Sequence, residues 1–143
     1  MMKTSDSRYG RCMYFSSNAL ARKTEKLALS VWKKVDLSPS HAYLLMIVLA
    51  EPGVQPGALS EELHLSPSTI TRLIERLEEK KLVIRATEGK MTNVYPTAKS
   101  KDMKQQLQDC AEEFQKNCIL LLGKEETGRF VNSMNKMADK LPD

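Results

Sequence analysis

Apolar residues recur along most of this chain at intervals of three and four, the spacing that predicts amphipathic helices. The first such stretch runs from about 12 to 34 and contains neither glycine nor proline. A second begins at Ser38-Pro39, an N-cap followed by proline at the first helical position. From Ala42 to Ala50 this second helix is apolar on all sides. A helix without a polar face should lie at the centre of the core.

Two shorter helices should follow. Pro56 can open the first, and Ser66-Pro67 repeats the start signal for the second, which should reach about Lys81. The tight linker at 64–66 is typical of a helix-turn-helix. At 100° per residue, the apolar residues of the second helix fall within about 100° of arc, opposite its polar residues. These apolar residues are Ile70, Leu73, Ile74 and Leu77.

The periodicity then changes to two, the period of a β-strand. Residues 82–87 are β-branched and apolar, Glu88-Gly89-Lys90 provides a turn, and residues 91–96 return as a second strand. An isolated hairpin is marginally stable, so this one must pack against the helices.

The C-terminal third should form two more helices. Thr97 can cap a long helix that reaches about Leu122, and Gly123 should end it. The last helix should cover about 125–141. Each carries an apolar seam, which one small chain can hardly cover alone, and this predicts an obligate homodimer. The seam residues are Met103, Leu107, Ala111, Phe114, Cys118 and Leu121 on the first helix, and Phe130, Met134, Met137 and Leu141 on the second.

Composition and charge narrow the class of protein. With 143 residues, 41% hydrophobic and 28% charged, the chain is long enough for one domain with a core of its own. Three cysteines do not suggest a disulfide framework, and no signal peptide is apparent, so a cytoplasmic protein is expected. No apolar run approaches about 20 residues, so a membrane span is not expected. The net charge of +4 comes from residues 1–36, whereas residues 54–96 carry six charges of each sign. Charge alone therefore does not locate a nucleic-acid surface.

Two short helices followed by one hairpin indicate a winged helix-turn-helix, in a mainly α fold with one small β-hairpin. In this fold a recognition helix can lie in the major groove of double-stranded DNA. Hydroxyl side chains in the first turns of the 67–81 helix suit phosphates and base edges, and arginine can contact guanine in a bidentate manner. The predicted DNA-contacting residues are Gln55, Ser66, Ser68, Thr69, Thr71, Arg72, Arg76, Arg85 and Lys90.

The segment from Leu59 to Arg85, LSEELHLSPSTITRLIERLEEKKLVIR, closely resembles the DNA-binding core of the MarR family of bacterial transcription regulators. The later YPTAKS at 95–100 resembles the family's step into its fifth helix. The resemblance covers 12–141 in helix order. It implies a single domain over residues 1–143, with dimerisation helices at about 12–36 and 98–141 and a winged helix-turn-helix at about 37–97.

The resemblance also implies a mode of action. Such a protein would associate with the nucleoid and bind a palindromic operator as a homodimer, usually as a repressor. A small, often aromatic and anionic, effector would release it from a pocket between the dimer helices and the winged domain. Tyr14, Tyr43 and Met46 are the candidates to line that pocket, and no cofactor is implied. The chain lacks the family's Asp-Arg-Arg at the wing tip, where Lys90 is the nearest substitute, and has Ser100 where glycine is usual.

Two alternatives stay open, a redox sensor at Cys12 and a winged helix that binds a protein. Cys12 opens the first helix after Arg8 and Arg11, and a helix start with nearby cations lowers a thiol pKa. Peroxide-sensing members of the family carry a reactive cysteine near this point. Cys12 is therefore either a redox sensor or inert. Cys118 is expected to be the buried cysteine of the seam.

His41 and His64 lie on separate helices, which does not favour a metal site. Without a nucleotide-binding or hydrolase motif, an enzyme is not expected. A winged helix can also bind proteins instead of DNA, and exposed apolar residues on the 67–81 helix would favour that reading.

Overall fold

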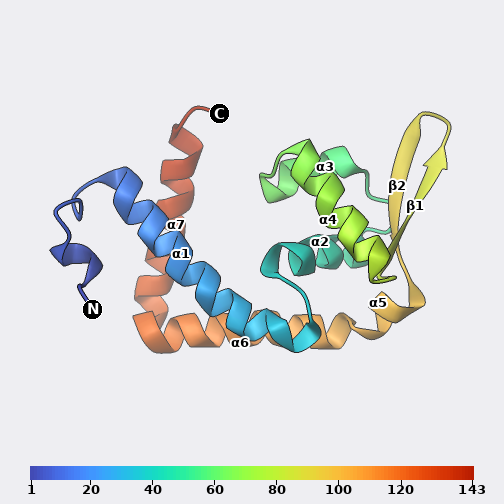
Figure 1. The fold of residues 1–143 in the computed structure, drawn as a ribbon. Coiled ribbons are helices and arrows are strands. Elements are labelled where there is room, and N and C mark those ends of the chain that lie inside the picture. Colours follow the sequence, from blue (N-terminus) through green and yellow to red (C-terminus); the bar gives the residue numbers. More distant parts are fainter.

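The computed structural model describes all residues, 1–143, as two groups of elements joined by one long helix (Figure 1). At one end α1 and α7 lie near the chain termini, and at the other α2, α3, α4 and a hairpin form a lobe that packs against α1 and α6. The helices are η1 (Thr4–Asp6), α1 (Met13–Trp32), η2 (Lys33–Val35), α2 (Pro39–Ala50), α3 (Pro56–Leu63), α4 (Pro67–Glu79), α5 (Ala98–Asp102), α6 (Lys104–Leu122) and α7 (Lys124–Lys140), and the strands are β1 (Val83–Glu88) and β2 (Met91–Pro96). No helix is both long and apolar enough to cross a bilayer.

The helix starts predicted from the sequence are confirmed. The Ser38 and Ser66 side chains accept hydrogen bonds from the backbone N–H groups of His41 and Thr69. Thr97 forms a capping box with Ser100. These bonds satisfy N–H groups that the first turn of a helix otherwise leaves without partners.

The prediction of a single long helix after Thr97 is wrong in one respect, because the segment is divided at Met103 into α5 and α6. The Ser100 side chain is fully buried, and its hydroxyl donates to the Thr97 carbonyl at 3.1 Å. The Met103 N–H then bonds to the Ser100 carbonyl, three residues back, at 3.0 Å. A serine hydroxyl that bonds to the backbone competes with the regular helical pattern and tightens the turn.

The core is one cluster built around α2, as its apolar sequence predicts. Leu44, Leu45 and Val48 of α2 are completely buried, together with Trp32 of α1 and Leu107 of α6. The predicted inner face of α4 is confirmed, since its four apolar residues all belong to this cluster. However, α2 is not covered on every side: Tyr43 is exposed, and Met46 and Ile47 are partly buried.

The cysteine predicted to be buried is the wrong one. Cys110 is only 5% exposed, whereas Cys118 is half-buried. The Cys110 thiol donates to the Val31 carbonyl, and burial raises its pKa. Cys110 therefore faces α1, and Cys118 lies further along α6, beyond the best covered part of the core.

The hairpin is antiparallel, with Val83 opposite Pro96 and Glu88 opposite Met91. Gly89 has φ +65° in the two-residue turn, a conformation that glycine adopts without strain. The base of the hairpin is fastened to the loop after α2. There the Val94 N–H donates to the Val54 carbonyl at 2.9 Å, and the Gly53 N–H donates to the Val94 carbonyl at 2.8 Å. These bonds provide the support that an isolated hairpin needs.

Candidate DNA-binding surface

Helices α3 and α4 are joined by a tight turn at His64, which has φ +54°. The Leu65 N–H donates to the Ser60 carbonyl, and the Ser60 hydroxyl donates back to the Leu65 carbonyl. This local bonding lets α4 follow α3 after three residues. The buried side of α4 packs into the core, so its other side is presented to solvent.

Hydroxyl groups cluster at the N-terminal end of α4. The Ser66 hydroxyl lies 2.9 Å from that of Thr69 and 3.2 Å from that of Ser68. The Thr71 hydroxyl donates to the Pro67 carbonyl at 3.0 Å. Ser66, Ser68 and Thr71 are exposed, and Thr69 is partly buried. The four hydroxyls predicted to meet DNA are thus brought together, with Thr71 already committed to the backbone.

The arginines of this region differ in their partners. Arg76 Nη1 pairs with Glu79 Oε2 at 2.9 Å on the same helix. Arg85 Nη2 of β1 pairs with Glu78 Oε1 of α4 at 2.7 Å, so it ties the hairpin to the helix. Arg72 is exposed and forms neither an ion pair nor a side-chain hydrogen bond within the chain. Arg72 is therefore the arginine of α4 that is free to contact a ligand.

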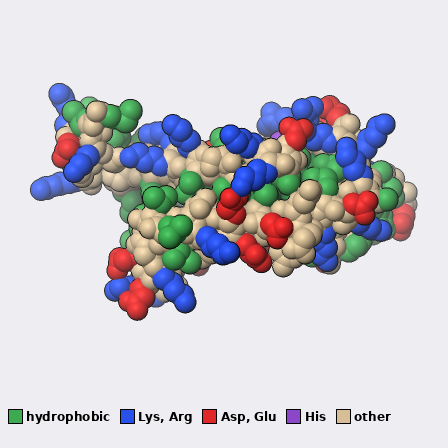
Figure 2. Space-filling model, turned by 90° about the horizontal axis from the view of Figure 1, so that it is seen from below, with side chains coloured by type: hydrophobic (Ala, Val, Ile, Leu, Met, Phe, Trp, Pro, Cys, Tyr) green, Lys and Arg blue, Asp and Glu red, His purple; other side chains and the backbone are tan.

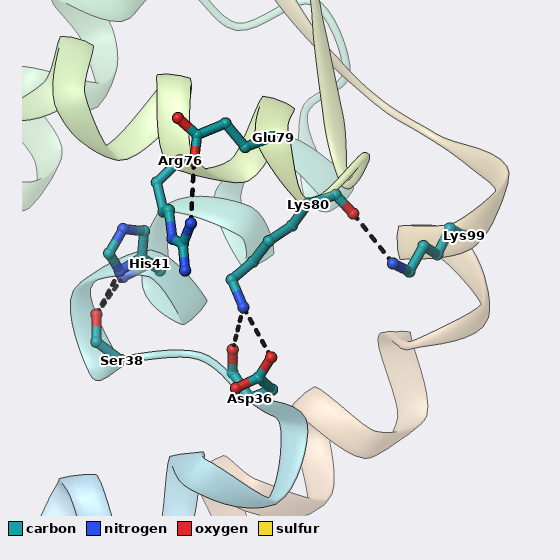
Figure 3. Close-up of polar contacts among 7 residues, drawn as sticks. All are labelled: Asp36, Ser38, His41, Arg76, Glu79, Lys80 and Lys99. Atoms are coloured by element: carbon teal, nitrogen blue, oxygen red, sulfur yellow. Dashed lines mark hydrogen bonds and ion pairs between the residues drawn. The ribbon is translucent and has the colours of Figure 1, made fainter.

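The C-terminal end of α4 is anchored to the segment between α1 and α2 (Figure 3). Lys80 Nζ lies 2.8 Å from Asp36 Oδ2 and 2.9 Å from the Asp36 carbonyl oxygen. The hydrogen bond from Lys80 and its charge hold the pKa of Asp36 below its usual value. Lys99 of α5 donates to the Lys80 carbonyl at 3.0 Å. These contacts fix where α4 ends relative to α1.

His41 lies beside this anchor, at the start of α2 (Figure 3). Its Nδ1 is within hydrogen-bonding distance of the Ser38 hydroxyl. Burial lowers the pKa of His41, and the positive charges of Arg76 and Lys80 lower it further. The neutral imidazole is therefore the form that this site favours.

Comparison with sequence families shows what this arrangement is similar to. Residues 35–90, which span α2, α3, α4, β1 and the turn of the hairpin, match the model of the MarR family. The part of the chain that forms the helix-turn-helix and the first strand of the wing is therefore similar to the MarR family. A search by sequence found no match among curated proteins.

Several solved structures share the fold along almost the whole chain. The transcriptional repressor CouR, bound to p-coumaroyl-CoA, is 14% identical with a TM-score of 0.84, and the alignment covers 97% of this chain and 100% of that one. MepR of S. aureus, in a DNA complex, is 17% identical with a TM-score of 0.78 and coverage of 90% and 98%. PcaV of Streptomyces coelicolor, in complex with its natural ligand, is 19% identical with a TM-score of 0.74 and coverage of 98% and 97%. At these identities the likeness establishes the fold.

Other predicted site residues of the chain lie apart from α4. Gln55 is exposed at the start of α3, and its side chain makes no capping bond. Lys90 is exposed at the tip of the hairpin. Cys12 is exposed immediately before α1.

The three residues predicted to line a ligand pocket are not all together. Tyr43 and Met46 line one hollow of about 430 Å³ between α2 and α3. Tyr14 is 79% exposed near the start of α1 and does not line this hollow. Sequence reasoning missed the remaining lining residues, because a helix that appears apolar on all sides gives no sign of which side stays uncovered.

Proposed function

We propose that this protein is a MarR-family transcriptional regulator that binds double-stranded DNA through α4, with the hairpin as the wing. The observation that carries the proposal is the division of α4 into a fully buried apolar side and an exposed side with clustered hydroxyls and the unpaired Arg72. A helix with its N-terminal hydroxyls and an arginine exposed can approach phosphates and base edges in the major groove. The DNA complex of MepR, which has a similar fold, supports DNA binding as the function.

A role as a protein-interaction module is less well supported. The exposed side of α4 carries no aromatic residue and no leucine, isoleucine, valine or methionine. Protein-binding helices usually insert such residues into a groove of the partner. The polar side of α4 therefore favours DNA.

We also propose that the protein acts as a homodimer, formed by the helices near its two termini. Hydrophobic side chains reach the surface at the end of the molecule where α1, α6 and α7 lie (Figure 2). The apolar seam predicted on α7 is exposed, and the only buried residue of that helix is Thr127. An apolar helix face in water is a strong reason for association, and a second copy offers the same surface by symmetry. The exposed residues of this seam are Phe130, Met134, Met137 and Leu141.

In the proposed mechanism the dimer represses transcription from a palindromic operator, and a small molecule releases it. Two copies of α4 would read half-sites about one helical turn apart. The ligand-bound structures of CouR and PcaV support control by a small molecule, and the hollow at Tyr43 and Met46 is the proposed effector site. The protein needs no cofactor and catalyses no reaction in this scheme, and it works on chromosomal DNA at the nucleoid in the cytoplasm.

Selection of bound DNA from a random library tests the proposal. The wild-type protein should enrich a palindromic motif, and Arg72→Ala should weaken binding to it by about 1–3 kcal/mol and relax one base position in each half-site. Arg129→Ala is the matched control, because Arg129 lies on α7 and pairs only with Glu125 and Glu126. No enriched motif, or equal binding by Arg72→Ala and Arg76→Ala and the wild type, would refute the assignment of α4.

A further inference from the structure

The hollow between α2 and α3 has an unusual balance of apolar and charged walls. Its volume of about 430 Å³ is sufficient for a small organic molecule. Five of its seven lining residues are hydrophobic, and the other two are glutamates. No lysine, arginine or histidine lines it. The lining residues are Tyr43, Met46, Ile47, Ala50, Glu51, Glu62 and Leu63.

The two glutamates are free to act on a ligand. Glu51 and Glu62 are exposed, and neither takes part in any of the ion pairs or side-chain hydrogen bonds of the chain, which involve other carboxylates. Glu51 is the C-cap of α2, and Glu62 lies in the last turn of α3. The C-terminal end of a helix carries a partial negative charge. Two carboxylates and two helix ends therefore make the potential in the hollow negative.

The aromatic wall adds a second attraction for positive charge. The Tyr43 ring packs edge-on against Trp32, with ring centroids 5.8 Å apart and planes at 89°. Burial raises the pKa of the Tyr43 phenol, and the nearby Cys118 and Glu25 raise it further, so the ring stays neutral at physiological pH. The face of a neutral tyrosine attracts cations.

We propose that the ligand accepted in this hollow is a lipophilic organic cation, with an apolar body and one positive charge. The apolar body would lie on Met46, Ile47 and Leu63, and the charge would lie near Glu51 and Glu62. An anionic ligand would meet two unpaired carboxylates and no compensating cation. This inference rests on the proposed function in one respect, since it assigns the chemical class of the effector that releases DNA.

Two probes of similar size and shape but opposite charge, tetraphenylphosphonium and tetraphenylborate, test the inference on the full-length protein. Trp32 is the only tryptophan of the chain and touches Tyr43, so its fluorescence reports binding, and calorimetry gives the affinity. The cation should bind at least tenfold more tightly than the borate. Glu51→Gln combined with Glu62→Gln should weaken the cation about fivefold, because each exposed carboxylate contributes modestly. Glu61→Gln is the control, since Glu61 is the neighbour of Glu62 but does not line the hollow.

The outcomes separate this inference from the proposed function. Tighter binding of tetraphenylborate, or unchanged cation binding by the double variant, would overturn the assignment of a cation. Cation binding that depends on the two glutamates supports it even without DNA in the sample. In gel-shift experiments with the selected motif, the cation should release wild-type protein at lower concentration than the double variant. A failure of the proposed DNA-binding function would appear separately, as the absence of any selected motif for the ligand-free wild type.

Discussion

Replacing Met134 with aspartate should separate the proposed dimer into monomers. Met134 lies in the middle of the exposed seam of α7 and is 40% exposed in the single chain. Full burial of a methionine side chain contributes about 1.5–3 kcal/mol, so covering the remaining two fifths contributes about 0.6–1.2 kcal/mol in each subunit. Because two copies change at once, the loss is about 1.2–2.4 kcal/mol per dimer, or roughly an eightfold to sixtyfold rise in Kd. Placing a carboxylate in an apolar interface adds its desolvation cost to this loss.

Light scattering combined with size-exclusion chromatography measures the effect. Wild-type protein at micromolar concentration should have about twice the chain mass of 16.2 kDa, and Met134→Asp should approach a single chain mass. Asn132→Asp introduces the same charge on the opposite side of α7, about 160° around the helix from Met134, and should remain dimeric. Because a monomer has only one α4, Met134→Asp should also lose affinity for the palindromic motif. A dimer that persists in Met134→Asp, or a wild-type protein that is monomeric and folded, would refute the reasoning.

Three further predictions concern the wing, the thiol and the histidine. Lys90→Ala should weaken binding to all DNA sequences about equally and reduce the slope of log K against log salt by about one unit per subunit, and a changed motif at constant slope would instead indicate base reading. If the protein is regulated by oxidation, Cys12→Ser should abolish its response to mild peroxide and leave DNA binding intact, and a response that survives the substitution excludes Cys12 as the sensor. Folding lowers the pKa of His41 below its ordinary value of 6.5, so the unfolded chain takes up this proton more readily than the folded protein. The folded state is therefore favoured at pH above 6.5, and this contribution to stability is lost as the pH falls below it. Thermal unfolding between pH 7.5 and 5 should therefore show a smaller loss for His41→Gln than for the wild type, and equal losses would contradict this role.

The sequence by itself determined the order of elements and most of their ends. Ser38, Ser66 and Thr97 act on backbone groups three residues away, so their capping role can be seen in a short window of sequence. The inner side of α4 follows from helical periodicity alone, and the hairpin from the change to period two. The family resemblance rested on the same short-range pattern, which is why it located the helix-turn-helix correctly.

Only the tertiary structure decided which polar groups are free and which sides of the helices are covered. Arg72 and Arg76 look equivalent in sequence, but Arg76 pairs with Glu79 whereas Arg72 has no partner within the chain. Lys80 meets Asp36 across 44 positions of the chain, a separation at which the sequence carries no spacing signal. Ser100 is buried where the long helix predicted after Thr97 divides into α5 and α6, and Cys110 is buried in place of Cys118. Both depend on what packs against α5 and α6. Local hydrogen bonds form between residues a few positions apart, whereas burial and ion pairing depend on surfaces that the folded chain brings together from distant positions.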